Sequence, residues 1–190
     1  MTARAAAAEE TRHRILSSTL ALSGEKSTLE IVLADVAERA GVTTKTILRH
    51  FGSRAGLFDA VAEFARDEIV HERVAPVGNI FAAVTAVVGH YEERGDWVMW
   101  MLGQENSDDR VRGVVEVGRV VHRDWVATTF RPQLDSTPTA DRETVLDLIA
   151  IATDVYTWKF LRRDRNLARG DTEQRMRVLV EAIVNRHAAE

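Results

Sequence analysis

Hydrophobic residues recur along most of the chain at helical spacing, and short runs that alternate between apolar and polar positions are missing. In the segment LADVAERA, for example, Leu33, Val36, Ala37 and Ala40 occupy positions i, i+3, i+4 and i+7, which places them on one face of a short amphipathic helix. The chain contains only 3 prolines and 11 glycines, so few residues interrupt long helices. The pattern therefore predicts an all-α fold.

The same periodicity divides the chain into a series of predicted helices. The N-terminal ones cover residues 9–23, residues 33–40, a second short helix that Thr43 can cap, and a longer helix from residue 54 that Ser53 can cap. Gly41 follows residues 33–40, where a glycine commonly ends a helix in the left-handed conformation. Further helices are expected at residues 79–94, 96–106, 109–131, 138–163 and 172–187.

These helices are expected to form two domains. The segment VAPVG, at residues 74–78, is the clearest boundary in the chain. An N-terminal three-helix domain is predicted for residues 1–54, a connecting helix for residues 54–73, and a C-terminal helical domain for residues 74–190. A chain of 190 residues, 45% of them apolar, is long enough for one good core or for two small ones.

Charge is distributed unevenly along the chain, which carries 25 Lys and Arg against 29 Asp and Glu. Residues 1–66 contain nine bases and eight acids, and the remainder contains sixteen bases and twenty-one acids. From Arg39 to Arg54 there are four bases and no acid. Contact with phosphate requires such a locally basic surface, because each neutralised phosphate releases counterions. Only the N-terminal third is therefore expected to meet a polyanion without general repulsion.

The two short helices with a glycine between them are typical of a helix-turn-helix. Ile47 and Phe51 share the inward face of the second helix, and Thr44, Lys45 and Arg49 point outward. A short helix with this outer face fits a major groove, where basic side chains reach guanine edges or phosphates. A plain helical hairpin with a solvated basic face has the same pattern, so periodicity alone leaves both interpretations open.

Linked motifs in the surrounding sequence favour the first interpretation. The segments TRHRIL, LADVAERAGVTTKTILRHF and GSRAGLFDAVAEF follow in this order from residue 11 to about residue 64. Together they resemble the DNA-binding domain of TetR-family transcriptional regulators. GRVVHRDWV (118–126) and DVYTWKFLRRDRNL (154–167) are similar to the C-terminal part of a subset of that family, so the resemblance covers nearly the whole chain.

The resemblance implies a DNA-binding transcriptional regulator, a repressor released from a palindromic operator when a small-molecule effector binds. It also implies a homodimer, because two recognition helices must reach successive major grooves. The positions that match the family's DNA-binding residues are Thr43, Thr44, Lys45, Thr46, Leu48, Arg49, His50 and Arg54.

Two positions depart from the family pattern. Val32 stands where the family usually has Ser or Thr as the cap of the second helix, and Leu48 stands where it favours Tyr. Valine has no side-chain acceptor, so this cap costs about 1 kcal/mol relative to Ser or Thr. Because both changes remove expected phosphate contacts, the alternative function is a helical small-molecule-binding or interaction protein with a vestigial DNA-binding head.

Aromatic residues gather in the C-terminal part of the chain. Any helix bundle needs such residues for its core, but Trp, Tyr and Met also line apolar ligand cavities. The TetR resemblance places an effector cavity in this region. The candidate lining residues are Tyr91, Trp97, Trp100, Met101, Gln104, His122, Trp125, Tyr156 and Trp158.

The predicted helix at residues 138–163 is apolar on two stripes, and the last helix carries one strong stripe. A helix with two apolar stripes needs partners on both sides. Neighbours within one subunit would satisfy this need. The TetR resemblance implies instead that both helices pair with their copies across a two-fold axis. The residues expected at the dimer interface are Leu148, Ala152, Val155, Met176, Leu179, Val180 and Ile183.

No pattern in the sequence supports an enzyme. The chain has no cysteine, and its six histidines form no metal-binding pair, so neither a metal nor a cofactor is expected. Gly-rich phosphate loops and nucleophile motifs are missing as well. No 18 apolar residues run together and the N-terminus lacks an apolar signal region, which predicts a cytoplasmic protein without membrane contact.

Overall fold

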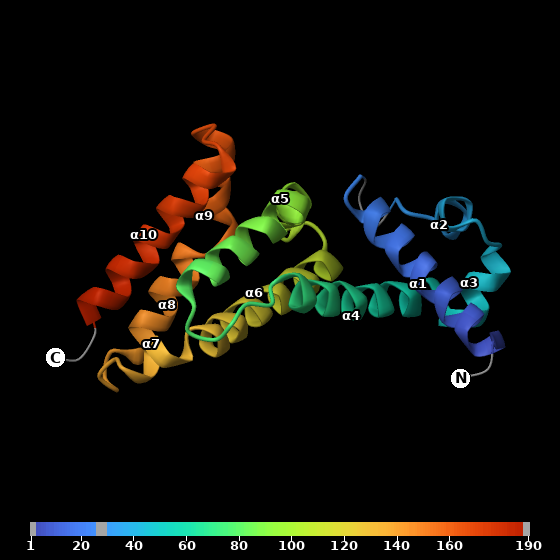
Figure 1. Ribbon diagram of the computed structural model, residues 1–190. Coiled ribbons are helices and arrows are strands. Elements are labelled where there is room, and N and C mark those ends of the chain that lie inside the picture. Colours follow the sequence, from blue (N-terminus) through green and yellow to red (C-terminus); the bar gives the residue numbers. More distant parts are fainter. Residues whose placement is uncertain (1–2, 26–29, 188–190) are drawn as a thin grey trace. The chain divides into compact units, whose positions relative to one another are not determined.

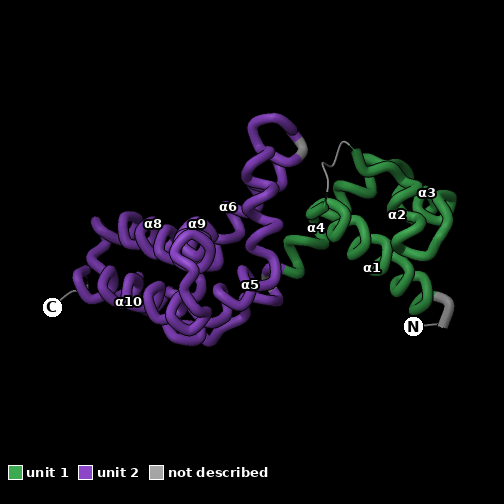
Figure 2. Tube along the Cα trace, turned by 90° about the horizontal axis from the view of Figure 1, so that it is seen from above, with its two compact units in different colours: residues 1–68 green, residues 69–190 purple. Residues whose placement is uncertain are grey.

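The computed structural model describes residues 3–25 and 30–187, and all regular structure in these ranges is helical (Figure 1). This confirms the predicted all-α fold. The chain divides into two compact units, residues 1–68 (unit 1) and residues 69–190 (unit 2), and the division falls within helix α4 (Figure 2). Within the described ranges, no helix combines the length and the hydrophobicity needed to cross a membrane.

Unit 1 contains α1 (Ala3–Ser23), α2 (Leu33–Ala40), α3 (Thr44–Phe51) and most of α4 (Arg54–Glu72). Helix α2 packs against both α1 and α3. The core is small and aliphatic, because each helix contributes only one narrow apolar stripe. Its fully buried members include Ile15, Leu16, Ile31, Val36, Ile47 and Leu57.

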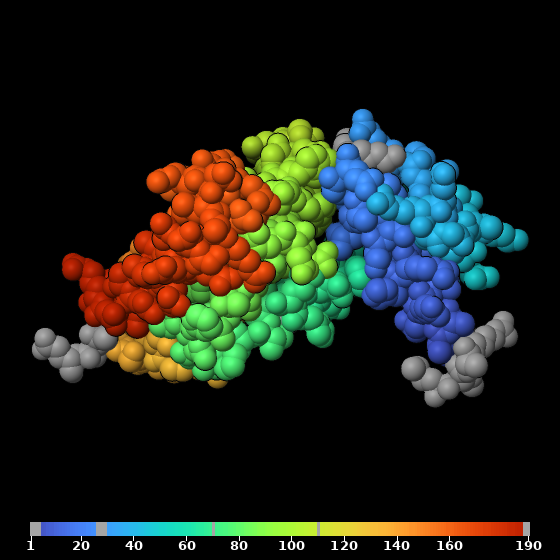
Figure 3. Space-filling view, turned by 45° about the horizontal axis from the view of Figure 1, so that its top comes forward, coloured from blue at the N-terminus to red at the C-terminus, as the bar shows by residue number. Residues whose placement is uncertain are grey.

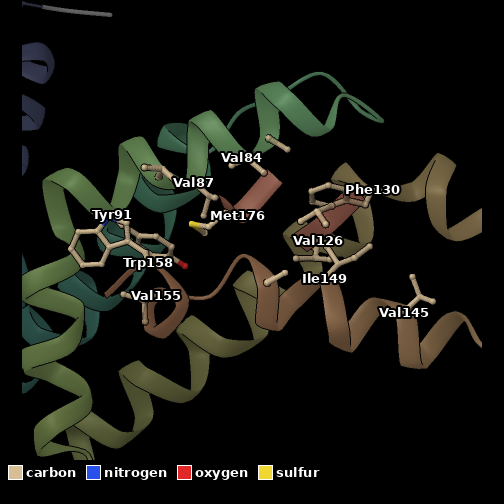
Figure 4. Close-up of a cluster of buried hydrophobic side chains, with 14 residues drawn as sticks. Val84, Val87, Tyr91, Val126, Phe130, Val145, Ile149, Val155, Trp158 and Met176 are labelled. Carbon is tan, nitrogen blue, oxygen red and sulfur yellow. The ribbon is translucent and has the colours of Figure 1, made fainter. Parts of the chain in front are cut away.

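Unit 2 contains the end of α4, then α5 (Ile80–Gln104), α6 (Asp109–Thr129), α7 (Arg131–Asp135), α8 (Arg142–Ala152), α9 (Val155–Lys159), the π-helical turn η1 (Phe160–Asp164) and α10 (Arg169–His187). Helix α10 lies along α5, and its red surface adjoins the green surface of α5 in Figure 3. The main core lies between α5, α6, α8, α9 and α10, with Trp158 and Phe130 as its largest buried side chains (Figure 4).

The structure contradicts the prediction of two helices at residues 79–94 and 96–106. A single helix, α5, spans both ranges, and Gly95 lies inside it. A Cβ atom on Gly95 would lie 2.5 Å from Cη2 of Trp158, far inside van der Waals contact. The glycine therefore admits the indole ring of α9 instead of ending a helix.

The structure also contradicts the prediction of one continuous helix at residues 138–163. Helix α8 begins only at Arg142, and it ends at Ala152. A new helix, α9, then starts after Asp154, whose carboxylate accepts a hydrogen bond from the amide of Tyr156 at 2.8 Å. Asp154 is therefore the N-cap of a new helix, within a segment that the apolar periodicity predicted to be one continuous helix.

The break between α8 and α9 exposes a carbonyl group that a continuous helix would use. The amide of Asp154 donates to Ile151 at 3.2 Å, so the oxygen of Ala150 lacks its usual i+4 partner. The ring of His122 donates to this oxygen from Nε2 at 3.1 Å. Next to it, the hydroxyl of Tyr91 donates to the carbonyl oxygen of Thr153 at 3.2 Å. Two buried side chains of other helices thus satisfy the backbone at the break.

Candidate functional site

The turn between α2 and α3 follows from local chemistry. Gly41 adopts φ +64°, a conformation that side chains with a Cβ rarely take, and the next amide, Val42, donates to Ala37 at 2.9 Å. Thr43 then caps α3, since its hydroxyl accepts a hydrogen bond from the amide of Thr46 at 3.1 Å. The predicted helix end at Gly41 and the predicted cap at Thr43 are both confirmed.

The end of α3 is joined to α4 by a second compact turn. Gly52 adopts φ +73°, and the hydroxyl of Ser53 accepts a hydrogen bond from the amide of Gly56 at 3.0 Å. This confirms Ser53 as the predicted cap of the fourth helix. A Cβ on Gly56 would collide with the carbonyl oxygen of Phe51, so a glycine is required in this first turn of α4.

The outward face of α3 carries positive charge that no described residue of unit 1 neutralises. Ile47 is completely buried, while Thr44, Lys45 and Arg49 are exposed, as predicted. The side chains of Lys45 and Arg49 form no ion pair with the described residues. Leu48 is 43% exposed on the same helix, so a large apolar side chain also faces solvent there. This surface of α3 offers two cations, hydroxyl groups and no acid.

The other two bases of the acid-free segment are engaged within unit 1. Arg39 forms an ion pair with Glu25, with Nη1 and Nη2 each 2.7 Å from a carboxylate oxygen. Arg54 donates from Nε to the carbonyl oxygen of Ile31 at 3.1 Å, and its guanidinium lies 4.7 Å from the ring centre of Phe58. Of the four bases, Lys45 and Arg49 therefore supply the open charge, and Arg54 contributes to the packing of unit 1.

The start of α2 is only half capped. Val32 has the extended backbone of an N-cap, and its amide donates to the carboxylate of Asp35 at 3.3 Å. The valine side chain offers no acceptor in return, so the first-turn amides of α2 lack the partner that Ser or Thr would provide. Val32 is also 52% exposed, so its backbone, and not the packing of its side chain, defines its place at the start of α2.

Unit 2 contains a polar cluster where α4 ends. His90 of α5 donates from Nδ1 to Glu72 at 2.6 Å, and Arg94 donates from Nε to both carboxylate oxygens, at 2.7 and 2.9 Å. Burial, reinforced by the positive charge of Arg73, lowers the pKa of His90 to about 3. Burial alone would raise the pKa of Glu72, but the hydrogen bonds from Arg94 and His90 outweigh burial and lower it. The imidazole of His90 is therefore neutral at physiological pH.

Arg73, the residue after α4, is the second centre of this cluster. Its side chain is only 6% exposed, and Nη1 donates to Nδ1 of His122 at 3.0 Å. Because a guanidinium always donates, Nδ1 of His122 must accept, and the ring proton lies on Nε2. Burial and the charge of Arg73 lower the pKa of His122 to about 4, which agrees with a neutral ring. The indole of Trp125 donates to the carbonyl oxygen of Arg73 at 2.8 Å.

Periodicity did not single out Glu72 or Arg73, because a charged residue at the end of a helix is ordinarily solvated. His90, inside α5, belonged to no motif. In the same cluster, burial raises the pKa of Tyr91 to about 12, so its phenol stays protonated. No group of three His, Asp or Glu residues in the described ranges is arranged to hold a metal ion.

The predicted ligand-lining residues do not form one group. Tyr91, Trp125 and Trp158 lie in or against the main core. Trp97, Trp100 and Met101 belong to a separate apolar cluster with residues of α6. Gln104 donates to the backbone of its own helix, His122 joins Arg73, and Tyr156 is 53% exposed. The gathering of aromatic residues on neighbouring predicted helices brought these residues into one candidate set, while the fold distributes them over two clusters and the surface.

The predicted interface residues are also divided. Met176 and Val180 are fully buried in the core of unit 2, and Ala152 and Val155 are 4% exposed, so these four are unavailable to a partner. Leu148 and Ile183 are half-buried, and Leu179 is 45% exposed. The strongest apolar stripe of each helix serves the subunit itself. The exposed large apolar residues on α8 and α10 are the predicted Leu179 together with Ile151 and Val178, which were not predicted.

Comparisons with known proteins agree with the geometry of α2 and α3. Residues 15–61 match the family model of bacterial regulatory proteins, tetR family. A transcriptional regulator from Rhodococcus sp. Rha1 has a TM-score of 0.68 at 14% identity, over 94% of this chain and 98% of that one. A tetR-family transcriptional regulator from Streptomyces coelicolor has a TM-score of 0.66 at 21% identity, over 94% and 88%.

A third solved structure, a transcriptional regulator from Saccharomonospora viridis in complex with choline, has a TM-score of 0.58 at 16% identity, over 91% of this chain and 96% of that one. No curated protein sequence matches the chain. The family match confirms the TetR resemblance over residues 15–61, and the chain as a whole has the fold of these solved structures.

Proposed function

We propose that this protein is a dimeric TetR-type transcriptional repressor, in which unit 1 binds a near-palindromic operator and unit 2 binds a small-molecule effector that releases it. The observation that carries the proposal is the outward face of α3, where Lys45 and Arg49 are exposed and unpaired in a segment without acids. Phosphate contact needs such a surface, and the neighbouring threonines offer hydroxyl and methyl groups to base edges.

The residues of α3 take different roles in this proposal. Thr44 and Lys45 stand in the first turn, where a recognition helix meets bases and its dipole favours phosphate. Arg49 lies one turn further on and reaches either a guanine edge or the backbone. The hydroxyl of Thr43 is already bonded to the amide of Thr46, so Thr43 positions the helix. Arg54 holds the start of α4 against Ile31 and supports α3 indirectly.

Release by an effector is a matter of linkage. The effector prefers a conformation in which the two recognition helices have the wrong spacing for the operator, so effector binding weakens operator binding. The operator weakens effector binding by the same factor. The complex of the Saccharomonospora viridis regulator with choline supports this part of the proposal, since a protein of this fold there holds a small molecule.

Dimerisation is supported by apolar side chains on the surfaces of two neighbouring helices. Helices α8 and α10 pack against each other, and they expose Ile151 (63%), Val178 (53%) and Leu179 (45%). Apolar groups gathered on a surface commonly mark an interface. A two-fold dimer must place its recognition helices about 34–36 Å apart, so the operator is expected to be a near-palindrome.

Operator selection from random DNA, followed by gel shifts over a series of salt concentrations, tests DNA binding. Lys45→Ala should weaken binding and reduce the salt slope by about one unit, because one phosphate contact is lost. Lys159→Ala, which removes a half-buried lysine of unit 2 that pairs with Asp164, is the control and should change neither. If folded Lys45→Ala and Arg49→Ala proteins bind like the wild type, the face is merely solvated and the vestigial-head alternative holds.

Sedimentation velocity tests the dimer separately. Leu179→Glu should yield monomer, because a charge on the exposed face of α10 opposes its burial against a partner. Val74→Glu places the same charge at a 75% exposed position of unit 2 outside the helices, and it should leave the dimer intact. A Leu179→Glu protein that remains dimeric would contradict this interface while leaving DNA binding open.

A further inference from the structure

Arg73 is a buried cation that pairs with no carboxylate among the described residues of unit 2. The adjacent acid, Glu72, is occupied by Arg94 and His90. Asp154 acts electrostatically on both Tyr91 and His122, but its carboxylate caps α9. Among the residues that the structure describes, Arg73 forms no ion pair, although the residue is only 6% exposed. A charge in this position is strongly destabilising unless a counter-ion reaches it.

The groups that do contact Arg73 are neutral. Nη1 donates to the ring of His122, and the guanidinium lies 5.1 Å from the ring centre of Tyr91. Both rings are uncharged, because burial lowers the pKa of His122 to about 4 and raises that of Tyr91 to about 12. The Nε–H group of Arg73 is buried and has no acceptor at all. The fold therefore orients this guanidinium without neutralising it.

A second unpaired atom belongs to His90, whose ring contacts that of Tyr91. His90 donates from Nδ1 to Glu72, and its other nitrogen, Nε2, is buried without a partner. The ring centre of His90 lies 5.3 Å from that of Tyr91. Burial lowers the pKa of His90 most, and the charge of Arg73 lowers it further. Buried polar atoms in native proteins nearly always have partners, so two of them around Tyr91 mark an incomplete polar site.

We propose that Arg73 binds the carboxylate of the effector, which is a small organic acid with an apolar body. The proposal rests on the proposed function and names the chemical class of its effector. One carboxylate oxygen accepts from Nε–H of Arg73, a geometry for which a guanidinium is well shaped. Tyr91, Trp125 and His122 supply flat, uncharged surfaces beside the anion. Arg73 follows α4 directly, so the bound anion acts on the residue at which the connecting helix ends.

A comparison of acids with their amides tests the proposal on the intact protein. The melting temperature, followed by tryptophan fluorescence at constant ionic strength, is measured with benzoate, phenylacetate and hexanoate and with the amide of each. At least one acid should raise the melting temperature by a few degrees through mass action, and its amide should not. Arg73→Gln should weaken binding of that acid about tenfold or more, because a charged hydrogen bond is lost.

Arg163→Gln is the matched control. Its guanidinium also lies over an aromatic ring, 4.6 Å from the centre of Trp158, but it is paired with Asp96 near the surface. This variant should bind the acid like the wild type. If Arg73→Gln does not fold, Arg73→Lys replaces it as the test variant, because lysine keeps the positive charge but lacks the planar guanidinium. Arg73→Lys should bind the acid more weakly than the wild type does, and it should bind the acid more tightly than the amide.

Acids and amides that stabilise the wild type equally would overturn the proposal, and so would undiminished binding by a folded Arg73→Gln protein. Operator affinity is measured in parallel with and without the acid. Acid binding that leaves operator affinity unchanged would retain the anion site and refute its role in release. Wild-type protein that binds no DNA but binds the acid through Arg73 would refute the proposed function alone.

Discussion

Units 1 and 2 handle their charged groups in opposite ways. In unit 1 the cations of α3 are exposed and unpaired, and the acid-free segment keeps carboxylates away from them. In unit 2, Arg73 and His90 are buried, His90 donates to the half-buried Glu72, and Arg73 donates to His122. An exposed cation binds any phosphate and is screened by salt. A buried one is oriented, barely screened and selective, so the contrast separates a polyanion surface from a site for one small anion.

The distribution of tryptophans makes this contrast measurable. All four, Trp97, Trp100, Trp125 and Trp158, belong to unit 2. Intrinsic fluorescence therefore reports on unit 2 alone, while far-UV circular dichroism reports on the helices of both units.

The largest effect is expected from the core of unit 2. Trp158 is fully buried, and its indole donates to Glu92 at 2.9 Å, so Trp158→Ala leaves a cavity and removes one of the hydrogen bonds to this carboxylate. The free energy of unfolding of unit 2 should fall by about 3–5 kcal/mol. Urea titrations followed by the remaining tryptophans measure this. Tyr156→Ala, at a 53% exposed position two residues earlier, should change stability by no more than about 0.5 kcal/mol.

Acidification should destabilise unit 2 through its buried histidines. Folding lowers the pKa of His90 to about 3 and that of His122 to about 4, from an ordinary value of 6.5. The unfolded chain therefore binds more protons below pH 6.5, and stability is lost as the pH falls toward these folded values. Between pH 7 and pH 5 each histidine should contribute a loss of about 2 kcal/mol. Fluorescence-monitored urea unfolding that is unchanged between the two pH values would contradict neutral buried rings.

The close approach of α5 and α9 can be broken with one methyl group. Gly95→Ala should destabilise unit 2 by about 1–3 kcal/mol, because the new Cβ overlaps the ring of Trp158. Gly103→Ala, in the same helix, has nothing within 4 Å of the new Cβ, and it should stabilise by up to about 1 kcal/mol through helix propensity. Equal effects of the two substitutions on the urea midpoint would show that Gly95 is not needed for packing.

The smallest effect is expected at the half-capped helix of unit 1. Val32→Thr supplies the missing acceptor for the first turn of α2 and should stabilise unit 1 by up to about 1 kcal/mol. Circular dichroism should record a later unfolding transition, and tryptophan fluorescence should not change. A Val120→Thr control, at an exposed position inside α6, offers no cap and should not reproduce the gain. An unchanged transition for Val32→Thr would show that Asp35 already suffices.

The sequence alone predicted most of unit 1, because its chemistry is local. Gly41 has to end α2 in a left-handed conformation, Thr43 and Ser53 have to cap the helices that follow them, and the apolar spacing turns Ile47 inward. Each of these features depends on neighbours within four residues. The linked motifs indicated the TetR resemblance, which the family model matches over residues 15–61, and the outward positions of Lys45 and Arg49 followed from the same helical period.

Only the tertiary structure decided what happens in unit 2, because the deciding contacts join residues far apart in the chain. Trp158 makes Gly95 a packing position inside α5, although a glycine there resembles a helix end. Asp154 breaks the long apolar helix, and His122 and Tyr91 of other helices satisfy the backbone at that break. The burial of Arg73 could not be predicted from the sequence for the same reason. Periodicity shows which side of a helix is apolar, but burial depends on the helices that pack around it.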